Sequence, residues 1–562
     1  MRHLPLLAVL TLPLACGDDS AAGTLSATDS DSDSGATTTT PTTSTTTAAS
    51  ESEAGSATAG ACTPGQSSAC LCPSGDPGLQ ICDGDGAGYG PCECSGVCGD
   101  GVQGDGEACD DGPSNADDAA CTSACQLATC GDGLVHAGVE ACDDGVNDGG
   151  YGGCVPGCAA LGPRCGDSVT NGREACDDGD AIDGNGCNVD CLLSGAEIWT
   201  ERYTGRDAGD AIAHGVAVDL DGNVIVVGEE FVVGQSANIW IAKYTAAGAL
   251  LWSQSVVGAG AGIDIARGVA VAPDGAIVVV GQLAVQGQGT DLWLRKLDGA
   301  GKELWTRAYN GKSNLGDSGN AVAIDTYGEI YVAGDEYQLI GLSNALVRKY
   351  SPAGDLLWSD TYDHELGNDY ARAIALTPTG DPVVVGSVYE PLGLAELWVR
   401  KYASDGVLLW TRAEDFAAGN DIGRGVAVDP TGDILLTGEI YAPIGLANIL
   451  VRRLSGDGDL IWEDVYDSKG SDNDIGRAIA ISPDGTIVVA GQEYTANDFA
   501  GIWVRKYTPE GATWWTHSYD GPGAGDDIAR AAAIAPNGSI YAAGQEYMVG
   551  QFATLWLRKL TP

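Results

Sequence analysis

Residues 351–358 read SPAGDLLW, and the same stretch returns with small changes along the second half of the chain. The near copies are DGAGKELW at 298–305, ASDGVLLW at 403–410, SGDGDLIW at 455–462 and TPEGATWW at 508–515. Each copy has a glycine in a turn and a tryptophan a few residues later. A pattern that recurs at a fixed spacing indicates a repeated structural unit, and the size of that unit decides the fold.

The tryptophan register gives the period. It runs through Trp199, Trp252, Trp305, Trp358, Trp410, Trp462 and Trp515, with spacings of 53, 53, 53, 52, 52 and 53. Within one period, as in residues 420–462, four stretches rich in Val, Ile, Leu and Tyr alternate with turns of Gly, Asp or Pro, which is typical of β-hairpins. We therefore predict an all-β fold, a seven-bladed β-propeller over residues 196–562.

Two strand pairs suggest the order of strands within a blade. GVAVDLDGNVIVVG at 215–228 and GVAVDPTGDILLTG at 425–438 resemble the bacterial β-propeller repeats related to NHL propellers, and the resemblance spans about residues 197–562. It implies that the GVAV-like strand is innermost. The chain then begins with an outermost strand at 197–203 and ends with a third strand at 555–560, so the first segment completes the last blade and leaves no open edge.

The repeated tryptophan is interpreted as a packing residue. Glycine followed by tryptophan is similar to the docking motifs of quinoprotein dehydrogenases, and that resemblance also implies a packing role. Burial of such a side chain stabilises a fold by about 1.5–3 kcal/mol or more. We predict that each tryptophan wedges between blades, and we predict no cofactor from it.

The front of the chain is stabilised by different means. All 19 cysteines precede residue 195, and the net charge of −50 comes from 78 acidic and 28 basic side chains. A polyanionic surface repels phosphate backbones, which argues against a nucleic-acid partner.

The first residues predict export. An apolar run from Leu4 to Ala15 follows Arg2 and His3, and it has the length of a signal-peptide core. Ala15 directly before Cys16 resembles the bacterial lipoprotein processing site, which implies a lipid on Cys16 and a membrane anchor. Gly17 resembles outer-membrane sorting, so we expect an outer-membrane lipoprotein exposed at the cell surface. The alternative is an ordinary cleaved signal over residues 1–15.

Residues 16–61 are Ser, Thr, Ala, Gly and Asp with almost nothing to bury, so a disordered tether is expected. Residues 62–97 form a six-cysteine module that needs disulfides to hold a fold. Its expected disulfide residues are Cys62, Cys70, Cys72, Cys82, Cys92 and Cys94.

Three copies of one four-cysteine pattern follow over residues 98–195. The cysteines are Cys98, Cys109, Cys121 and Cys125, then Cys130, Cys142, Cys154 and Cys158, then Cys165, Cys176, Cys187 and Cys191. The copies resemble the myxobacterial-type disulfide repeat of secreted and surface proteins. Two disulfides per copy are expected, and their connectivity cannot be deduced from the sequence.

The repeats offer two kinds of metal ligand, cysteine sulfur and carboxylate or amide oxygen. Zinc is disfavoured because the exported region has no CxxC pair, and no metal ligand set is predicted. Calcium is the open alternative, because carboxylate and amide oxygens gather in the third copy; the simpler interpretation is that Asp and Gly form tight turns between disulfides. The oxygen-bearing residues are Asp177, Asp178, Asp180, Asp183 and Asn185.

The most regular polar feature of the propeller is Asp-x-x-Arg before the innermost strand. The pairs are Asp264 and Arg267, Asp369 and Arg372, Asp421 and Arg424, Asp474 and Arg477, and Asp527 and Arg530. His214 and Asn320 take the arginine position in the other two copies. We expect these residues around one mouth of the central channel, either as a circle of charge-assisted hydrogen bonds that join blades and cap turns or as a binding site. Because function usually breaks symmetry, the departures at His214 and Asn320 mark the candidate site.

A second set of carboxylates follows the second strand of the blades. It comprises Glu229, Glu230, Glu336, Glu439, Glu493 and Glu546. Solvated acidic loops are the simplest interpretation, with calcium or a basic partner as the alternative.

The propeller has no cysteine, no GxSxG and no HExxH, so no catalytic residues are predicted. The sequence favours a non-catalytic binding or display protein at the cell surface, with an unidentified protein or glycan as ligand. The alternative is an envelope hydrolase or oxidoreductase with its site at the channel mouth.

Overall fold

The computed structural model describes residues 62–562 apart from short gaps. The gaps are 72–76, 93–97, 100, 102, 105, 173, 181, 208, 261, 339–341, 365–366, 390–393, 417–418, 442–445, 469–472, 495–498 and 551. The predicted signal peptide, the Cys16 lipidation site, the tether, and Cys72 and Cys94 lie outside the described residues. The chain divides into two compact units, Met1–Ser95 and Gly96–Pro562.

The first unit holds one hairpin. Strands β1 (Ser67–Leu71) and β2 (Pro77–Ile81) pair antiparallel, and disulfides join Cys62 to Cys82 and Cys70 to Cys92. Leu71, Leu79 and Ile81 are exposed, so cross-links rather than an apolar core hold this hairpin.

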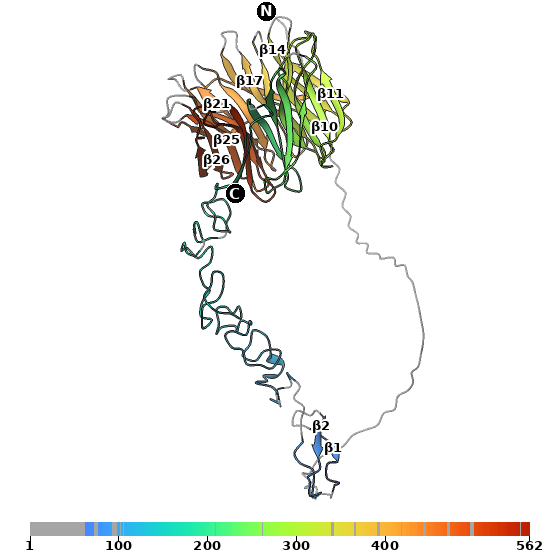
Figure 1. Cartoon of the computed structure of the whole chain (residues 1–562), viewed down its shortest axis with the longest axis vertical. Coiled ribbons are helices and arrows are strands. Elements are labelled where there is room, and N and C mark those ends of the chain that lie inside the picture. The colour runs from blue at the N-terminus through green and yellow to red at the C-terminus, as the bar shows by residue number, and fades with distance from the viewer. Residues whose placement is uncertain are drawn as a thin grey trace, which may run out of the picture. The chain divides into compact units, whose positions relative to one another are not determined.

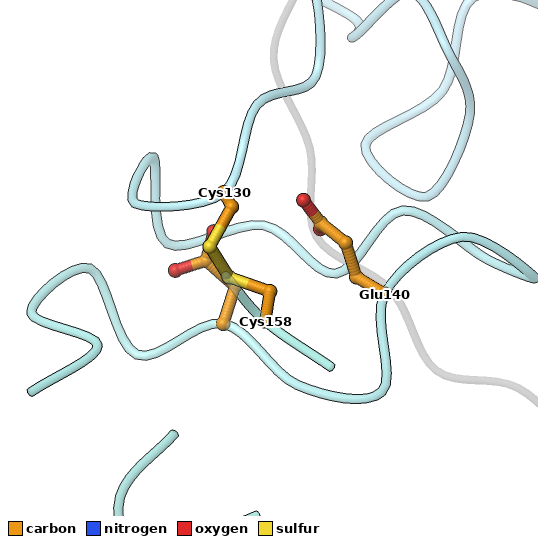
Figure 2. Close-up of side chains that lie close together, drawn as sticks. Cys130, Glu140 and Cys158 are labelled. Atoms are coloured by element: carbon orange, nitrogen blue, oxygen red, sulfur yellow. A yellow bond between two sulfur atoms is a disulfide. The ribbon is translucent and has the colours of Figure 1, made fainter. Parts of the chain in front are cut away.

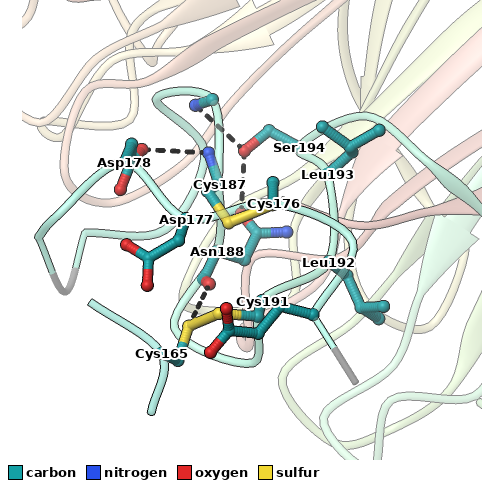
Figure 3. The surroundings of a disulfide bond; sticks show 12 residues. Cys165, Cys176, Asp177, Asp178, Cys187, Asn188, Cys191, Leu192, Leu193 and Ser194 are labelled. Carbon is teal, nitrogen blue, oxygen red and sulfur yellow. Dashed lines mark hydrogen bonds between the residues drawn. A yellow bond between two sulfur atoms is a disulfide. The ribbon is translucent and has the colours of Figure 1, made fainter. Parts of the chain in front are cut away.

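The three disulfide repeats share one nested connectivity. In each copy the first cysteine joins the fourth and the second joins the third. The bonds are Cys98–Cys125 and Cys109–Cys121, Cys130–Cys158 and Cys142–Cys154, and Cys165–Cys191 and Cys176–Cys187. Figure 3 shows the two disulfides of the third copy with the aspartates beside them. The one helical turn described here is the 3-10 helix η1 (Gly112–Ser114), so turns and cross-links define the repeats.

Seven four-stranded antiparallel sheets make up the rest of the second unit (Figure 1), which confirms the predicted seven-bladed propeller. Blade 1 is β4 (Ala211–Val218), β5 (Val224–Val232), β6 (Ser236–Tyr244) and β7 (Leu250–Val256). Blade 2 is β8 (Ile265–Val271), β9 (Ile277–Ala284), β10 (Thr290–Leu297) and β11 (Glu303–Tyr309). Blade 3 is β12 (Asp317–Ile324), β13 (Ile330–Tyr337), β14 (Ser343–Tyr350) and β15 (Leu356–Tyr362). Blade 4 is β16 (Tyr370–Leu376), β17 (Pro382–Tyr389), β18 (Ala395–Tyr402) and β19 (Leu408–Glu414).

The remaining blades follow the same order. Blade 5 is β20 (Ile422–Val428), β21 (Ile434–Tyr441), β22 (Ala447–Leu454) and β23 (Leu460–Tyr466). Blade 6 is β24 (Ile475–Ile481), β25 (Ile487–Tyr494), β26 (Ala500–Tyr507) and β27 (Thr513–Tyr519). Blade 7 is β28 (Ile528–Ile534), β29 (Ile540–Tyr547), β30 (Ala553–Leu560) and β3 (Glu197–Tyr203).

Blade 7 joins the two ends of the propeller. Its outer strand β3 pairs antiparallel with β30, with Glu197 opposite Leu560 and Tyr203 opposite Leu555. The predicted closure of the ring by the first and last strands is therefore confirmed. The same seam holds the third disulfide repeat, because the Thr561 hydroxyl donates a hydrogen bond to the Leu193 carbonyl at 2.7 Å.

The repeated glycine and tryptophan act as a pair between neighbouring blades. The Trp358 indole Nε1 of blade 3 donates a hydrogen bond to the Ser404 carbonyl of blade 4 at 3.1 Å. Gly406, in the same turn, has a φ of 91°, and a Cβ there would lie 2.9 Å from Trp358 Cδ2. Glycine thus allows both the left-handed turn and the close approach of the indole. The packing role that we predicted for the tryptophan is what its contacts support.

Candidate ligand-binding site at the channel mouth

Seven side chains at the innermost strands occupy β-bulges. In blade 2 the pairing of β8 with β9 shifts register between Ala266 and Gly268, and Arg267 is the extra residue. The same shift occurs in every blade. The bulged residues are His214, Arg267, Asn320, Arg372, Arg424, Arg477 and Arg530. A bulge re-aims one side chain out of the alternation of the strand.

The bulges bring these side chains together. One open cavity of about 180 Å³ is lined by His214, Arg267, Asn320, Arg372, Arg424, Arg477 and Arg530. The residues that flank the bulges are Gly or Ala, and a Cβ at Gly268 would lie only 3.0 Å from Ala321 Cα of the next blade. Small neighbours therefore allow the innermost strands to approach one another while the long side chains gather at the mouth.

The partners of the arginines lie one strand outward and are mostly neutral. Gln492 accepts hydrogen bonds from Arg477 Nε at 2.9 Å and Nη2 at 2.6 Å, and Gln545 accepts one from Arg530 Nη2 at 2.7 Å. Gln282 does the same for Arg267 at 3.1 Å. Amide oxygens hold these guanidiniums in place without neutralising their charge.

Arg372 has fewer hydrogen-bond partners than the other arginines of the ring. The strand position that holds Gln282 in blade 2 is occupied in blade 4 by Ser387, which pairs with Tyr370. Among the described residues no hydrogen bond or ion pair reaches the guanidinium, which lies 4.8 Å from the centre of the Tyr370 ring, and its Nε is buried without a partner. An unpaired guanidinium that lines a cavity is prepared to bind an anion.

Three carboxylates stand beside the ring. Glu439 accepts from Arg424 at 2.7 Å, Glu229 lies 3.1 Å from His214 Nε2, and Asp335 accepts from Asn320 Nδ2 at 2.8 Å. Five guanidiniums against three carboxylates leave two positive charges at the mouth when His214 is neutral. The cavity is therefore cationic although the whole chain carries −50.

The positive charges of the guanidiniums repel one another. Burial, together with the neighbouring charges of Arg424 and Arg530, lowers the pKa of Arg477 to about 9. Burial and the charge of Arg424 also lower the pKa of Arg372. A guanidinium remains protonated at neutral pH, so these directions indicate repulsion that a bound anion would relieve.

The aspartates of the Asp-x-x-Arg pattern do not line this cavity. Asp264 accepts hydrogen bonds from the Gly258 and Ala284 amides at 2.6 and 2.7 Å. Asp369, Asp421, Asp474 and Asp527 make the corresponding pairs of bonds, to the end of the second strand and to the preceding loop. The turn-capping part of the expectation therefore agrees with the structure, because these aspartates are buried caps for backbone amides. The other part, Asp–Arg hydrogen bonds that join blades, is not seen among the described residues.

The second set of carboxylates also divides in two. Glu229 and Glu439 stand beside the bulge ring, whereas the next position along the strand faces the neighbouring blade. There Glu336 accepts from the Tyr309 hydroxyl at 2.8 Å, and Glu493 accepts from the Tyr466 hydroxyl at 2.5 Å; Glu230 and Glu546 accept from Tyr203 and Tyr519. Glu230, Glu336, Glu439, Glu493 and Glu546 are all buried. The interpretation as solvated acidic loops is wrong for these five residues.

The acidic residues of the disulfide repeats are engaged in turns. Asp177 accepts from the amides of Gly166, Ser168 and Gly179 at 3.0, 2.9 and 2.9 Å, and Asp178 accepts from the Cys187 amide at 3.0 Å (Figure 3). Asp180 and Asp183 accept from the Ile182 and Val189 amides, and Asn185 donates to Asp180. These bonds support the turn interpretation, and calcium binding stays a prediction.

Each repeat holds a cluster of carboxylates and cysteine sulfur that resembles a metal site, and in each the cysteines are in disulfides; the cluster of the second repeat has the most members. Cys130, Glu140, Asp143 and Cys158 lie close enough to share an ion, and Figure 2 shows Glu140 beside the two cysteines. The two sulfur atoms form a disulfide, so neither is a thiolate ligand. Asp143 meanwhile accepts from the Gly131 and Gly145 amides at 2.6 and 2.8 Å.

Sequence reasoning missed the polar residues one strand outward from the ring. Gln282, Asp335, Gln492 and Gln545 occupy the position of Glu229 and Glu439 in the second strand. The signal was present in the repeat alignment, because each residue follows the glycine of the VVVG-like strand directly.

The comparisons with known proteins return distant structural similarity. No protein-family model and no curated protein matches the chain. Similar solved structures include the WD40 domain of coronin from Toxoplasma gondii, with 10% identity, 68% of this chain and 89% of that chain covered, and a TM-score of 0.40. Another is a fungal alcohol oxidase in complex with copper, with 13% identity, 66% and 76% covered, and a TM-score of 0.40. A protein of unknown function from Dyadobacter fermentans has 11% identity, 66% and 100% covered, and a TM-score of 0.37.

Proposed function

We propose that the protein is a binding protein whose propeller captures an anionic ligand at the arginine-lined mouth of its channel. The observation that supports this most directly is the unpaired Arg372 guanidinium within a ring of five arginines, most of which have neutral partners. Guanidiniums bind carboxylate and phosphate oxygens through paired hydrogen bonds, and they do so more strongly where solvent access is restricted.

The proposal includes the cellular setting. The disulfides indicate an exported protein, and no helix among the described residues is long and apolar enough to cross a membrane. We propose a surface lipoprotein of the outer membrane, with the lipid on Cys16, myxobacterial-type disulfide repeats as the stalk, and the NHL-like propeller as the head. Partition of the mature protein with membranes and its release by Cys16→Ser would support the anchor; a soluble mature wild type would refute it.

The enzyme alternative has weaker support at this site. The seven lining residues comprise five arginines, one asparagine and one histidine, with no serine, cysteine or carboxylate among them. His214 is held by Glu229, but a nucleophile within its reach is not among the lining residues. A hydrolase or oxidoreductase therefore stays a prediction.

Titration calorimetry of the full-length mature chain with inorganic phosphate and with citrate tests the anion site. We expect saturable binding that weakens with added sodium chloride. Arg372→Ala should lower the affinity by roughly tenfold or more, because a charge-assisted hydrogen bond is lost. Arg412→Ala is the matched control, since Arg412 lies on the outer strand of the same blade with its side chain 39% exposed. No saturable binding of any anion, or equal loss in both variants, would refute the proposal.

A further inference from the structure

The ring at the mouth is uneven, and its two halves differ in charge. Neighbouring blades are consecutive in the chain, since the innermost strands contact one another in the order β4, β8, β12, β16, β20, β24, β28 and back to β4. Blades 4–7 supply Arg372, Arg424, Arg477 and Arg530, and Glu439 is the carboxylate of this half that accepts a hydrogen bond from them. Asp335 and Glu229 of the flanking blades attract Arg372 and Arg530 without a hydrogen bond. Positive charge is therefore concentrated on this half.

In the half formed by blades 1–3, carboxylates outnumber guanidiniums. It holds one guanidinium, Arg267, between two copies where the arginine is replaced. His214 of blade 1 and Asn320 of blade 3 each have a carboxylate partner, Glu229 and Asp335. In the two blades that lack the arginine, the second strand carries a carboxylate beside the replacing residue. The replacement therefore changes both the charge of the cavity lining and the hydrogen-bonding groups that it offers.

The contact with Glu229 fixes what His214 offers to a ligand. A carboxylate accepts hydrogen bonds, so His214 Nε2 carries the proton in this pair at 3.1 Å. Burial lowers the pKa of His214, although Glu229 raises it, and Arg530 and Arg267 lower it further. In the neutral ring the second nitrogen, Nδ1, is then an acceptor. On the opposite side of Arg267, the Asn320 amide oxygen is a second acceptor and lies 3.1 Å from the Ser318 hydroxyl oxygen, which is closer to Asp335, at 2.8 Å.

The cavity sets the size of the ligand. Its volume of about 180 Å³ is below the roughly 300–1,000 Å³ of sites for drug-sized ligands. A long polyanion would extend over a chain that carries −50 and would be repelled there. The site therefore suits a compact ligand that remains within the mouth.

We propose that the mouth binds a compact oxyanion that also carries hydroxyl groups, the chemistry shared by sugar phosphates and sugar acids. The guanidiniums of blades 4–7 bind the oxyanion, and His214 Nδ1 accepts a hydrogen bond from a hydroxyl. This inference rests on the proposed function, because it names the ligand class of the same anion site.

Calorimetry on the full-length mature chain with four probes tests the inference. The probes are inorganic phosphate, glucose 6-phosphate, glucuronate and long-chain polyphosphate. Glucose 6-phosphate should bind about tenfold more tightly than inorganic phosphate, the gain expected from one further hydrogen bond. Glucuronate in place of the phosphate ester separates the two sources of the oxyanion, and polyphosphate should bind no more tightly than inorganic phosphate.

Two variants examine His214 directly. His214→Ala should abolish the tenfold preference for glucose 6-phosphate, measured as the ratio of its affinity to that of inorganic phosphate in the same variant, because the lost ring nitrogen is the acceptor for the sugar hydroxyl. His214→Arg makes the ring more uniform and should strengthen inorganic phosphate binding while it removes the preference for the sugar phosphate. His136→Ala, in the disulfide repeats, is the control, and thermal melts verify that each variant is folded.

The outcomes separate this inference from the proposed function. If inorganic phosphate binds in an Arg372-dependent manner but the sugar phosphate gains nothing, the inference is refuted and the anion site stands. If no probe binds, both fail. If polyphosphate binds most tightly, the ligand is an extended polyanion and the inference is refuted.

Discussion

Aspartates cap backbone amides in both the disulfide repeats and the propeller, but the pKa values of the caps at the start of the innermost strands of the propeller shift in the opposite direction to those of the repeats. In the repeats burial acts to raise the pKa of Asp177, yet bonds from four backbone amides hold it below the ordinary value. In the propeller burial dominates and raises the pKa of Asp317 and of Asp527 to about 6, although each accepts two amide bonds. The same interaction thus has a different sign of pH dependence where burial outweighs the amide hydrogen bonds, as it does for Asp317 and Asp527 in the propeller core.

The largest expected effect separates the regions by reduction. All 19 cysteines precede residue 195 and all 13 tryptophans follow it, so tryptophan fluorescence reports on the propeller alone. A reducing agent should unfold the repeats, which lose about 2–4 kcal/mol per disulfide, and should leave the tryptophan emission unchanged. Hydrogen exchange of peptides from both regions measures this. A red shift of the emission on reduction would contradict the comparison.

The next effect lies within the propeller core. Trp398 is 0% exposed and stacks on Tyr362 of the preceding blade with ring centroids 5.3 Å apart. Trp398→Ala should lower the free energy of unfolding by about 3–5 kcal/mol. Trp410→Ala, on the outer strand, should lower it less because Trp410 is only partly buried. Urea denaturation followed by circular dichroism gives both values, and equal losses would contradict the assignment of the core.

A third, smaller effect compares the caps themselves. Asp369 is 0% exposed and accepts from the His364 and Tyr389 amides at 2.5 and 3.2 Å. Asp369→Ala leaves two part-buried amides without this acceptor and should cost about 1–3 kcal/mol. Asp177→Ala should affect local exchange in its repeat and not the melting of the propeller, because its amides gain access to water. Similar melting shifts in the two variants would show that the regions are not independent.

The smallest effect is the response to acid. The folded-state pKa of Asp317 and Asp527 lies above the ordinary value of 3.8, so the folded state binds these protons more tightly. Their contribution to stability is complete below pH about 4 and is lost as the pH rises through about 6. The propeller should gain on the order of 1–2 kcal/mol between pH 7 and pH 5. The carboxylates with lowered pKa, Asp177 and also Asp219 and Asp429 of the blades, destabilise only below pH about 4. A propeller melting temperature that falls between pH 7 and pH 5 would contradict this sign.

The repeat period of the sequence was sufficient to predict the fold. The residues of the ring could be predicted too, because they occupy the same position in each repeat. The tryptophan spacing predicted seven blades, and the strand order placed β3 beside β30. Sequence alone could not show the β-bulges, because an extra residue in one strand leaves no mark on the hydrophobic pattern. It therefore grouped Glu229 with Glu230, although a one-residue difference sends one toward the channel and the other toward the next blade. The nested disulfides were equally hidden, since four cysteines allow three connectivities.

Closure by β3 and β30 also affects the time course of folding. The other propeller strands pair with strands that are next to them in the chain. Glu197 of β3, in contrast, pairs with Leu560 of β30 at the far end of the propeller. Contacts between distant residues form slowly, because a long loop must be ordered before they form. Until the final strand arrives, β3 and the last sheet each present an unpaired edge to other chains. The propeller is therefore most prone to aggregation at the end of its own synthesis, when six blades are complete and the seventh is still open.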